Sequence, residues 1–237
     1  MTVPPFSGKS FISFLSVPRV AASFWRPAKN LSRLRAAGLE IAEIRMDMAH
    51  VKNMEEARAL MAGYSTLPVI LTLRAKNEGG QWQKSETARR NLFLRLLPLA
   101  AAADIELSAP ILPQIAAAAK KSDKALIISR HNFSAPDSLA DMEKAAARAF
   151  AAGADIFKTA CLVRGCADLP PLRKFLQRWK THPIIAVGMG CSPAARRARA
   201  ELPQRGARLA YAAINETSAP GQLPLPETAA AIRAARG

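Results

Sequence analysis

Short apolar segments alternate with amphipathic helical patterns along nearly the whole chain, and this alternation limits the possible folds more than any other feature. Helical patterns lie between the apolar segments, for example at residues 54–63, 86–102 and 137–153. Short strands that are apolar on both faces and alternate with helices are typical of parallel βαβ units. We expect strands at residues 11–17, 40–46, 68–74, 103–107, 125–130, 154–160, 183–189 and 207–213.

The number of these units predicts an α/β fold of the (β/α)8 TIM barrel type. Such barrels have about 250 residues, so we expect residues 1–237 to form a single domain. An open, doubly wound sheet is the alternative. That fold usually has a glycine-rich phosphate loop after its first strand, and the segment SVPRVAASF (16–24) contains no glycine.

Composition excludes several classes of protein. No apolar run reaches the ~18 residues that a membrane span needs, so we expect no membrane association. The cysteines are odd in number and form no C-x-x-C pair, which indicates reduced thiols in a cytoplasmic protein. The histidines lie far apart in the sequence, so we expect no metal. The absence of acidic residues before Glu40 leaves organelle targeting open as an alternative.

The net charge of +16 has two interpretations, a nucleic-acid-binding surface or a solvated arginine-rich surface. Basic residues are spread over the chain, and their only local concentration, RRARAELPQR (196–205), contains no aromatic residue that could stack on bases. We therefore expect no nucleic-acid partner. The charge favours a small anionic substrate instead.

Polar residues gather where the predicted strands end. In a (β/α)8 barrel the active site lies at the C-terminal ends of the strands and in the loops that follow. The sequence therefore predicts a mouth that several strands line together. The residues at these positions are Glu43, Arg45, Arg74, Glu78, Glu106, His131, Lys158, Arg196, Arg197, Ser218 and Gln222.

Lys158 is the most unusual of them, because it interrupts the apolar run GADIFKTACLV (153–163). We expect burial and neighbouring arginines to lower the pKa of this lysine, since both disfavour the ammonium. A neutral amine can attack a ketone and form a Schiff base, and His131 on the preceding strand could act as the base. A lysine that snorkels at a strand end, and a histidine that only stabilises a turn, are the alternatives.

The segment ETSAPGQLPLP (216–226) predicts a ligand-binding loop after the last strand. Gly221 would let the backbone approach a ligand closely. Ser218 and Gln222 would donate hydrogen bonds to an oxyanion, and the guanidinium of Arg197 suits a substrate carboxylate. A plain connection between strand and helix is the alternative.

Several motifs together resemble type I 3-dehydroquinate dehydratase, from about Phe11 to the end of the chain. Their joint order and spacing are specific, although most of them are weak alone. The motifs are EIRMD (43–47), LTLRAKNEGG (71–80), DIEL (104–107), SRHNF (129–133), ADIFKTA (154–160), MGCSPAARR (189–197) and SAPGQ (218–222).

The resemblance implies a (β/α)8 barrel that converts 3-dehydroquinate to 3-dehydroshikimate in aromatic amino-acid synthesis, by a syn loss of water. It implies a lysine Schiff base, no cofactor or metal, and a homodimer. Lys158 would form the imine at the C3 ketone. His131 would remove the C2 proton and later assist loss of the C1 hydroxyl, and Glu78 would orient His131.

The resemblance also assigns substrate-binding residues. Arg197 is chosen as the carboxylate-binding arginine by counting eight residues from Met189. The chain departs from the family pattern at Asn132, where aspartate is usual, and at Pro193 and Arg196, where glycine and serine are usual. The expected contacts are Glu43, Arg45 and Arg74 to the ring hydroxyls and the lysine, and Arg197, Ser218 and Gln222 to the carboxylate and the C1 oxygen.

Two further functions remain open. Another Schiff-base barrel, such as an aldolase, would use the same lysine to cleave a carbon–carbon bond. A catalytically weak homologue with a binding or regulatory role would fit the altered loop after residue 189. The SAPGQ loop and the arginine favour the dehydratase over the aldolase.

Overall fold

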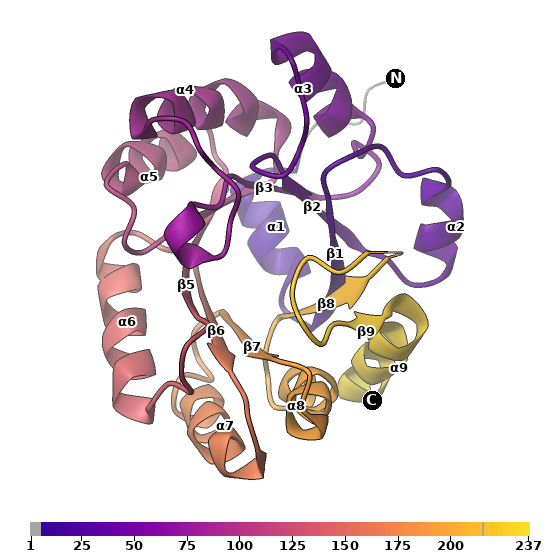
Figure 1. Ribbon diagram of the computed structural model, residues 1–237, viewed down its shortest axis with the longest axis vertical. Coiled ribbons are helices and arrows are strands. Elements are labelled where there is room, and N and C mark those ends of the chain that lie inside the picture. The colour runs from indigo at the N-terminus through magenta and orange to yellow at the C-terminus, as the bar shows by residue number, and fades with distance from the viewer. Residues whose placement is uncertain (1–5, 215) are drawn as a thin grey trace.

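Parallel strands curl around a common axis, and helices surround them on the outside (Figure 1). The computed structural model describes residues 6–214 and 216–237. Neighbouring strands follow the order β7-β6-β5-β4-β3-β2-β1-β8-β9. The strands are β1 (Arg19–Phe24), β2 (Ile41–Arg45), β3 (Val69–Thr72), β4 (Ala102–Glu106), β5 (Ala125–Asn132), β6 (Ile156–Leu162), β7 (Ile184–Met189), β8 (Leu209–Ala213) and β9 (Leu223–Pro224).

Each of the strands β1 to β8 is followed by a helix, as the sequence predicts for a (β/α)8 barrel. Short 3-10 turns lie at Lys76–Glu78 (η1), Leu97–Leu99 (η2) and Cys166–Asp168 (η3). The α-helices after the strands are α2 (Leu31–Ala36), α3 (Met54–Ala62), α4 (Glu86–Leu96), α5 (Leu112–Lys121), α6 (Leu139–Ala151), α7 (Leu169–Arg178), α8 (Pro193–Gln204) and α9 (Leu225–Arg236).

The barrel closes between β7 and β8 without a regular ladder. In the strand order, β7 and β9 are the two ends of the sheet. The backbone N–H of Arg208 donates to the carbonyl of Ile184 at 2.8 Å, and Gly190 N–H donates to the carbonyl of Pro220 at 3.4 Å. These contacts join the last strand and its loop to β7, so the ring of strands is complete.

The expected strand at residues 11–17 is wrong, because this segment forms helix α1 (Gly8–Phe14). Ser7 caps it by accepting a hydrogen bond from the N–H of Ser10, and Phe11 and Leu15 are buried on one face. This i, i+4 spacing is helical. The first strand is instead β1, whose RVAASF sequence is poor in the β-branched residues that favour strands.

Helix α1 closes the N-terminal end of the barrel, and it lies behind the strands in Figure 1. Phe11 and Leu15 belong to a buried cluster with residues from the beginnings of the strands. The other members of this inner layer include Ala21, Ile41, Ile70, Ala102, Ile127, Ile156, Ile185 and Leu209. The bottom of the barrel is therefore apolar.

Side chains alternate between the two faces of a strand, so the next inward position lies two residues further along each strand. These positions form a second layer that is almost wholly polar, above the apolar layer. Its members are Ser23, Glu43, Thr72, Asp104, Ser129, Lys158, Val187 and Tyr211. The strand register therefore places a charged layer directly on top of a hydrophobic one.

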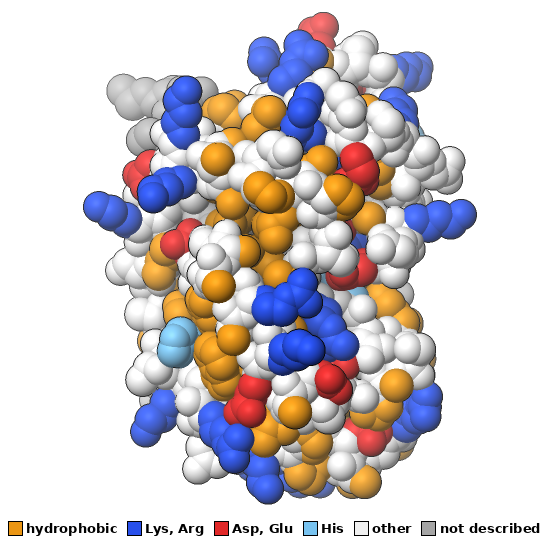
Figure 2. All heavy atoms as spheres, turned by 90° about the vertical axis from the view of Figure 1, so that its left-hand side faces the viewer, with side chains coloured by type: hydrophobic (Ala, Val, Ile, Leu, Met, Phe, Trp, Pro, Cys, Tyr) orange, Lys and Arg blue, Asp and Glu red, His pale blue; other side chains and the backbone are white. Residues whose placement is uncertain are grey.

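The face of the barrel shown in Figure 2 carries basic side chains at several heights. On the side of the barrel shown in Figure 2, Lys and Arg lie near the top, the middle and the bottom, with acidic side chains among them. This distribution agrees with the interpretation as a solvated surface. Of the helices in residues 6–214 and 216–237, none is long and apolar enough to cross a membrane.

Replacing Phe11 by alanine tests the role of α1 as the lower boundary of the core. Phe11 is fully buried, so its truncation should lower the free energy of unfolding by about 3–5 kcal/mol. Urea denaturation measures this change. Val17→Ala, at a position that is 38% exposed, is the control, and an equal loss in both variants would contradict the packing described here.

Candidate active site

A pocket opens at the C-terminal ends of the strands and contains about 520 Å3 of space that no protein atom fills, part of which is open to solvent. Most of the residues that we predicted for the mouth line this pocket, but Glu106, Arg196 and Arg197 do not. The predicted residues that line it are Lys158, His131, Glu78, Glu43, Arg45, Arg74, Ser218 and Gln222. The pocket also includes Tyr211, Ser23 and Arg199, which the sequence analysis did not select.

Lys158 points into the barrel and not into bulk solvent. It is 5% exposed, and its Nζ lies 2.8 Å from Oδ2 of Asp104 and 3.5 Å from Oε1 of Glu43. Nζ also donates to the hydroxyl of Tyr211 at 3.1 Å. The snorkelling alternative is therefore wrong, because the amine is enclosed by groups from β2, β4 and β8.

The expected lowering of the pKa of Lys158 is also wrong. Burial alone lowers this pKa, but the nearby Asp104, Tyr211 and Glu43 outweigh burial and raise it above the ordinary value. The acids that raise the pKa come from β2 and β4 and are not neighbours of Lys158 along its own strand. Lys158 is consequently an ammonium at neutral pH.

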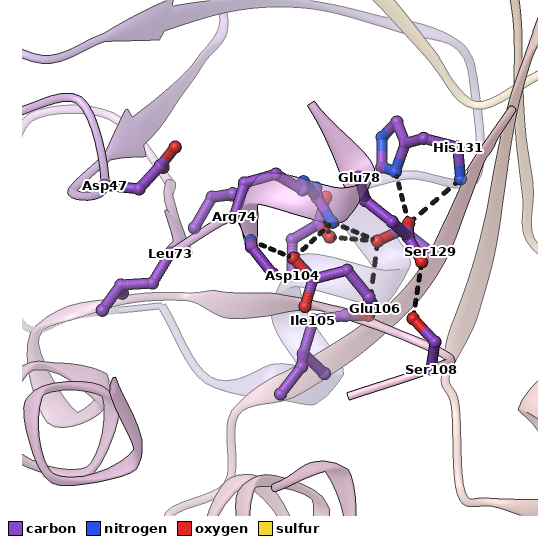
Figure 3. Close-up of polar contacts among 12 residues, drawn as sticks. Asp47, Leu73, Arg74, Glu78, Asp104, Ile105, Glu106, Ser108, Ser129 and His131 are labelled. Atoms are coloured by element: carbon purple, nitrogen blue, oxygen red, sulfur yellow. Dashed lines mark hydrogen bonds and ion pairs between the residues drawn. The ribbon is translucent and has the colours of Figure 1, made fainter. Parts of the chain in front are cut away.

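Asp104 is the acid that holds this ammonium, and Arg74 holds Asp104 from the other side. Arg74 donates to Oδ1 of Asp104 at 2.8 Å and to Oγ of Ser129 at 2.6 Å (Figure 3). Burial alone raises the pKa of Asp104, but the charges of Arg74 and Lys158 outweigh it and lower this pKa. Asp104 stays ionised, and Arg74 positions the lysine through it.

His131 is held by Glu78, as the sequence analysis expected. Oε2 of Glu78 accepts from the backbone N–H of His131 at 3.1 Å and lies 3.0 Å from its Nδ1 (Figure 3). Oε1 of Glu78 accepts from the hydroxyl of Ser108 at 2.7 Å. Because an ionised carboxylate only accepts, this geometry assigns the ring proton to Nδ1 and leaves Nε2 able to take a proton.

The pKa of His131 lies well below its ordinary value. Burial is the largest cause, and the positive charges of Arg74 and Lys158 lower it further. Burial also raises the pKa of Glu78. A neutral imidazole in the pocket can act as a base at neutral pH, which an imidazolium cannot do.

The loop after β8 is tied to the charged layer by a chain of hydrogen bonds. Oε1 of Gln222 accepts from the N–H of Ser218 at 2.8 Å, and the hydroxyl of Ser218 donates to Ser23 at 3.0 Å. Ser23 in turn donates to Glu43. Gly221 is needed where this loop meets β7, because a Cβ there would lie 1.8 Å from the carbonyl oxygen of Gly190.

The choice of Arg197 is wrong, because the structure does not bring it to the pocket. Its side chain is 68% exposed and lies 3.7 Å from Glu201 on the outer face of α8. Pro193 stands at the start of α8, with Ser192 as its N-cap, so the helix already includes the arginines. Its buried face contains Ala195, Ala198, Arg199 and Leu202.

Arg199 occupies the position at the pocket instead. It is 7% exposed, and its side chain donates a hydrogen bond to the carbonyl of Pro220 at 2.8 Å. Its Nε has no partner, and no acid of the described residues pairs with it. Burial lowers the pKa of Arg199 to about 10, so it remains a cation at neutral pH. Ala195, Ala198 and Leu202 stand at positions i, i+3 and i+7 of one helical face, and Arg199 takes the i+4 position of that face, which is the signal that could have identified it.

The departure at Asn132 has a clear structural consequence. Its amide donates to Oδ1 of Asp137 at 2.7 Å, and its oxygen accepts from the N–H groups of Ser134 and Ala135. Asn132 therefore shapes the turn after β5. Within the described residues, no group of three or more His, Cys, Asp or Glu is placed to hold a metal ion.

Comparison with known proteins connects this geometry to a family. The family model of type I 3-dehydroquinase matches residues 17–236. The 3-dehydroquinate dehydratase of Methanosarcina acetivorans is 33% identical over 218 residues, which cover 88% of this chain and 90% of the relative. The enzyme of the same name from Thermodesulfovibrio yellowstonii is 33% identical over 193 residues, covering 79% and 82%.

Solved structures show the same architecture. The 3-dehydroquinate dehydratase of Aquifex aeolicus superimposes with a TM-score of 0.79 at 26% identity, covering 92% of this chain and 98% of that one. The dehydratase of Geobacillus kaustophilus gives 0.78 at 23% identity, covering 93% and 92%. The curled parallel sheet is therefore a barrel of the same type.

Fold and pocket together define an α/β-barrel enzyme whose charged interior layer surrounds a buried lysine. The match over most of the chain, and the identity to curated relatives, make the assignment more specific. The chain belongs to the type I 3-dehydroquinase family, and its enzyme class is that of the hydro-lyases.

The low pKa of His131 can be measured directly. We expect its imidazole to titrate with a midpoint below the ordinary value of 6.5, because burial and two nearby cations oppose protonation. NMR of histidine-labelled protein follows the titration, and a His131→Gln variant assigns the signal by its disappearance. A midpoint at or above 6.5 would contradict the electrostatic account of the pocket.

Proposed function

We propose that the chain dehydrates 3-dehydroquinate to 3-dehydroshikimate through a Schiff base on Lys158. Family membership supports the substrate, and the pocket supports the mechanism. The observation that carries the proposal is the enclosed Nζ of Lys158, in the same pocket as a histidine whose Nε2 can accept a proton. A ketone that enters this pocket meets a nucleophile and a base together.

The first step joins the amine to the C3 ketone. An ammonium and a ketone give a protonated imine and one water, so no net proton leaves the pocket. The nitrogen must lose a proton briefly in order to attack, and it carries a positive charge again in the imine. Asp104 and Glu43, which stabilise the ammonium, also stabilise this cation. The acids therefore favour both the starting state and the product of the step.

The second step is the loss of water. The protonated imine withdraws electrons and acidifies the C2–H bond, and Nε2 of His131 takes that proton to give an enamine. The electron pair of the enamine then expels the C1 hydroxyl, which leaves as water with a proton returned by His131. One residue serves both transfers on one face of the ring, which gives a syn elimination. Hydrolysis of the imine releases the product and restores Lys158.

The carboxylate of the substrate needs a cation, and Arg199 is suited to it. Arg199 is buried, charged and free of any acidic partner in the described residues. Ser218 and Gln222 from the loop after β8 line the same pocket and offer hydrogen bonds to the C1 oxygen or the carboxylate. Arg45 lies at the pocket as well, paired with Asp47 at 2.7 Å, and suits a ring hydroxyl.

The cellular setting is proposed from the family alone. We place the reaction in the shikimate pathway of aromatic amino-acid synthesis, in the cytoplasm, and carried out by a homodimer without a cofactor or metal. Size-exclusion chromatography with light scattering measures the oligomeric state, and a monomer would remove that part of the proposal without affecting the chemistry.

Borohydride trapping tests the central step. Incubation with 3-dehydroquinate and borohydride should add covalent mass to the wild-type protein, and peptide mapping should place it on Lys158. Lys158→Ala should abolish trapping and turnover, since the nucleophile is gone. The ultraviolet absorbance of the conjugated enone product measures turnover. Trapping without enone formation would indicate an aldolase or a binding homologue, and a wild type that traps nothing would refute the Schiff base.

Arg199 and Arg197 provide a matched pair for the carboxylate contact. Arg199→Met should raise KM or lower kcat/KM by about 10- to 100-fold, because a charge-assisted hydrogen bond contributes about 1.5–3 kcal/mol. Arg197→Met should have kinetic constants near those of the wild type, since its side chain faces outward. Initial rates of enone formation measure both. If Arg197→Met had the larger effect on kcat/KM, the carboxylate contact would be assigned to Arg197.

A further inference from the structure

Arg89 is a buried cation that the proposed mechanism does not use. It comes from helix α4, in the outer layer of the barrel, yet it is 0% exposed and is the largest fully buried side chain among the described residues. It does not line the pocket. Burying a guanidinium is costly unless it is paired, so its position needs an explanation.

The guanidinium of Arg89 pairs with Glu106 at the end of β4. Its Nη2 lies 3.1 Å from Oε2 of Glu106 and 3.2 Å from Oε2 of Glu86, and its Nη1 donates to the carbonyl of Leu73 at 3.4 Å. Oε1 of Glu106 accepts from the N–H of Ala75 at 2.8 Å. The pair therefore contacts the backbone on both sides of Arg74.

This short backbone segment carries two groups of the site. Arg74 lies between Leu73 and Ala75 and donates to Asp104 and Ser129 (Figure 3). Asp104 in turn accepts a hydrogen bond from Lys158. The turn η1 follows immediately, and its Glu78 N–H donates to the carbonyl of Ala75 at 3.1 Å. Glu78 then holds His131. Both the lysine and the histidine are thus oriented from residues 73–78.

The packing around this segment leaves little freedom. Gly80 lies so close that a Cβ would be 2.0 Å from the carbonyl oxygen of Arg74, and the N–H of Gly80 also donates to Ala75 at 3.0 Å. The Arg89–Glu106 pair therefore contacts the backbone where this tight turn begins. A buried ion pair rarely adds much stability over apolar residues of the same volume, so its placement is better explained by precise positioning.

We propose that the Arg89–Glu106 pair fixes the backbone of residues 73–75 and thereby aims Arg74 at Asp104 and Glu78 at His131. Arg89 is a positioning residue, since it touches neither the substrate nor a reacting atom. The inference rests on the proposed function. A displacement of catalytic groups by about 1 Å can cost about 10²-fold in rate, so the pair can control turnover from outside the pocket.

Substitutions at Arg89 test this role against an exposed arginine on the same helix. Arg89→Met should lower kcat by about 10²-fold and change KM far less, because the groups that bind the substrate remain in the pocket. Arg89→Lys keeps the charge but cannot contact both carboxylates and the carbonyl at once, so its kcat should be intermediate. Arg95→Met, exposed on α4, should have the kinetic constants of the wild type.

A double variant separates positioning from stability. Arg89→Met with Glu106→Gln removes both buried charges, so its urea midpoint should return towards that of the wild type, while its kcat should stay low. Recovery of kcat together with stability would overturn the proposal, and so would an Arg89→Lys enzyme with wild-type kcat. A wild type that forms no enone would instead refute the proposed function. The urea midpoints of the variants can be compared whatever the outcome of that test.

Discussion

The buried ion pair between Lys158 and Asp104 is the interaction on which the site depends. Lys158 would be costly to bury among the apolar residues of its own strand, and the acid from β4, across the barrel, makes its position possible. Removing Asp104 would leave two buried cations, Lys158 and Arg74, without the acid that both contact. The same pair links the chemistry to the fold, because Arg74 orients Asp104 and is itself held by the segment that carries Glu78.

The charged layer follows from the simple period of a strand. Ile156, Lys158 and Ala160 face inward in succession along β6, and Ile127, Ser129 and His131 do so along the neighbouring β5. The register pairs Ser129 with Lys158, so the lysine lies in the layer directly below that of the histidine. A one-residue slip of either strand would turn these side chains outward. Correct pairing of β5 with β6 is therefore a requirement of the proposed mechanism as well as of the fold.

Much of the fold and of the site could be predicted from the sequence because both depend on local patterns. Alternating apolar runs identified seven strands, and the motifs placed His131 and Lys158 on the neighbouring strands β5 and β6, and Glu78 in the turn after β3. The errors have physical reasons. The alanine-rich β1 lacks strand propensity, and FISFLSV has apolar residues at a spacing that suits a helix as well as a strand. Tertiary packing determines the structure of both segments, and local sequence patterns do not show tertiary packing.

The electrostatics of the pocket could not be predicted from sequence, because they depend on partners from distant strands. Among the described residues, Lys158, Arg74 and Arg45 are cations at the pocket that each have a carboxylate partner, whereas Arg199 has none. A positive charge without a partner in a buried site is stabilised by an incoming anion, and the paired cations contribute little net attraction. The pocket should therefore select a ligand with a single carboxylate. A second anionic group would meet only cations that are already neutralised by Asp104, Glu43 or Asp47. The free-energy cost of removing this group from water would then not be offset by a cation.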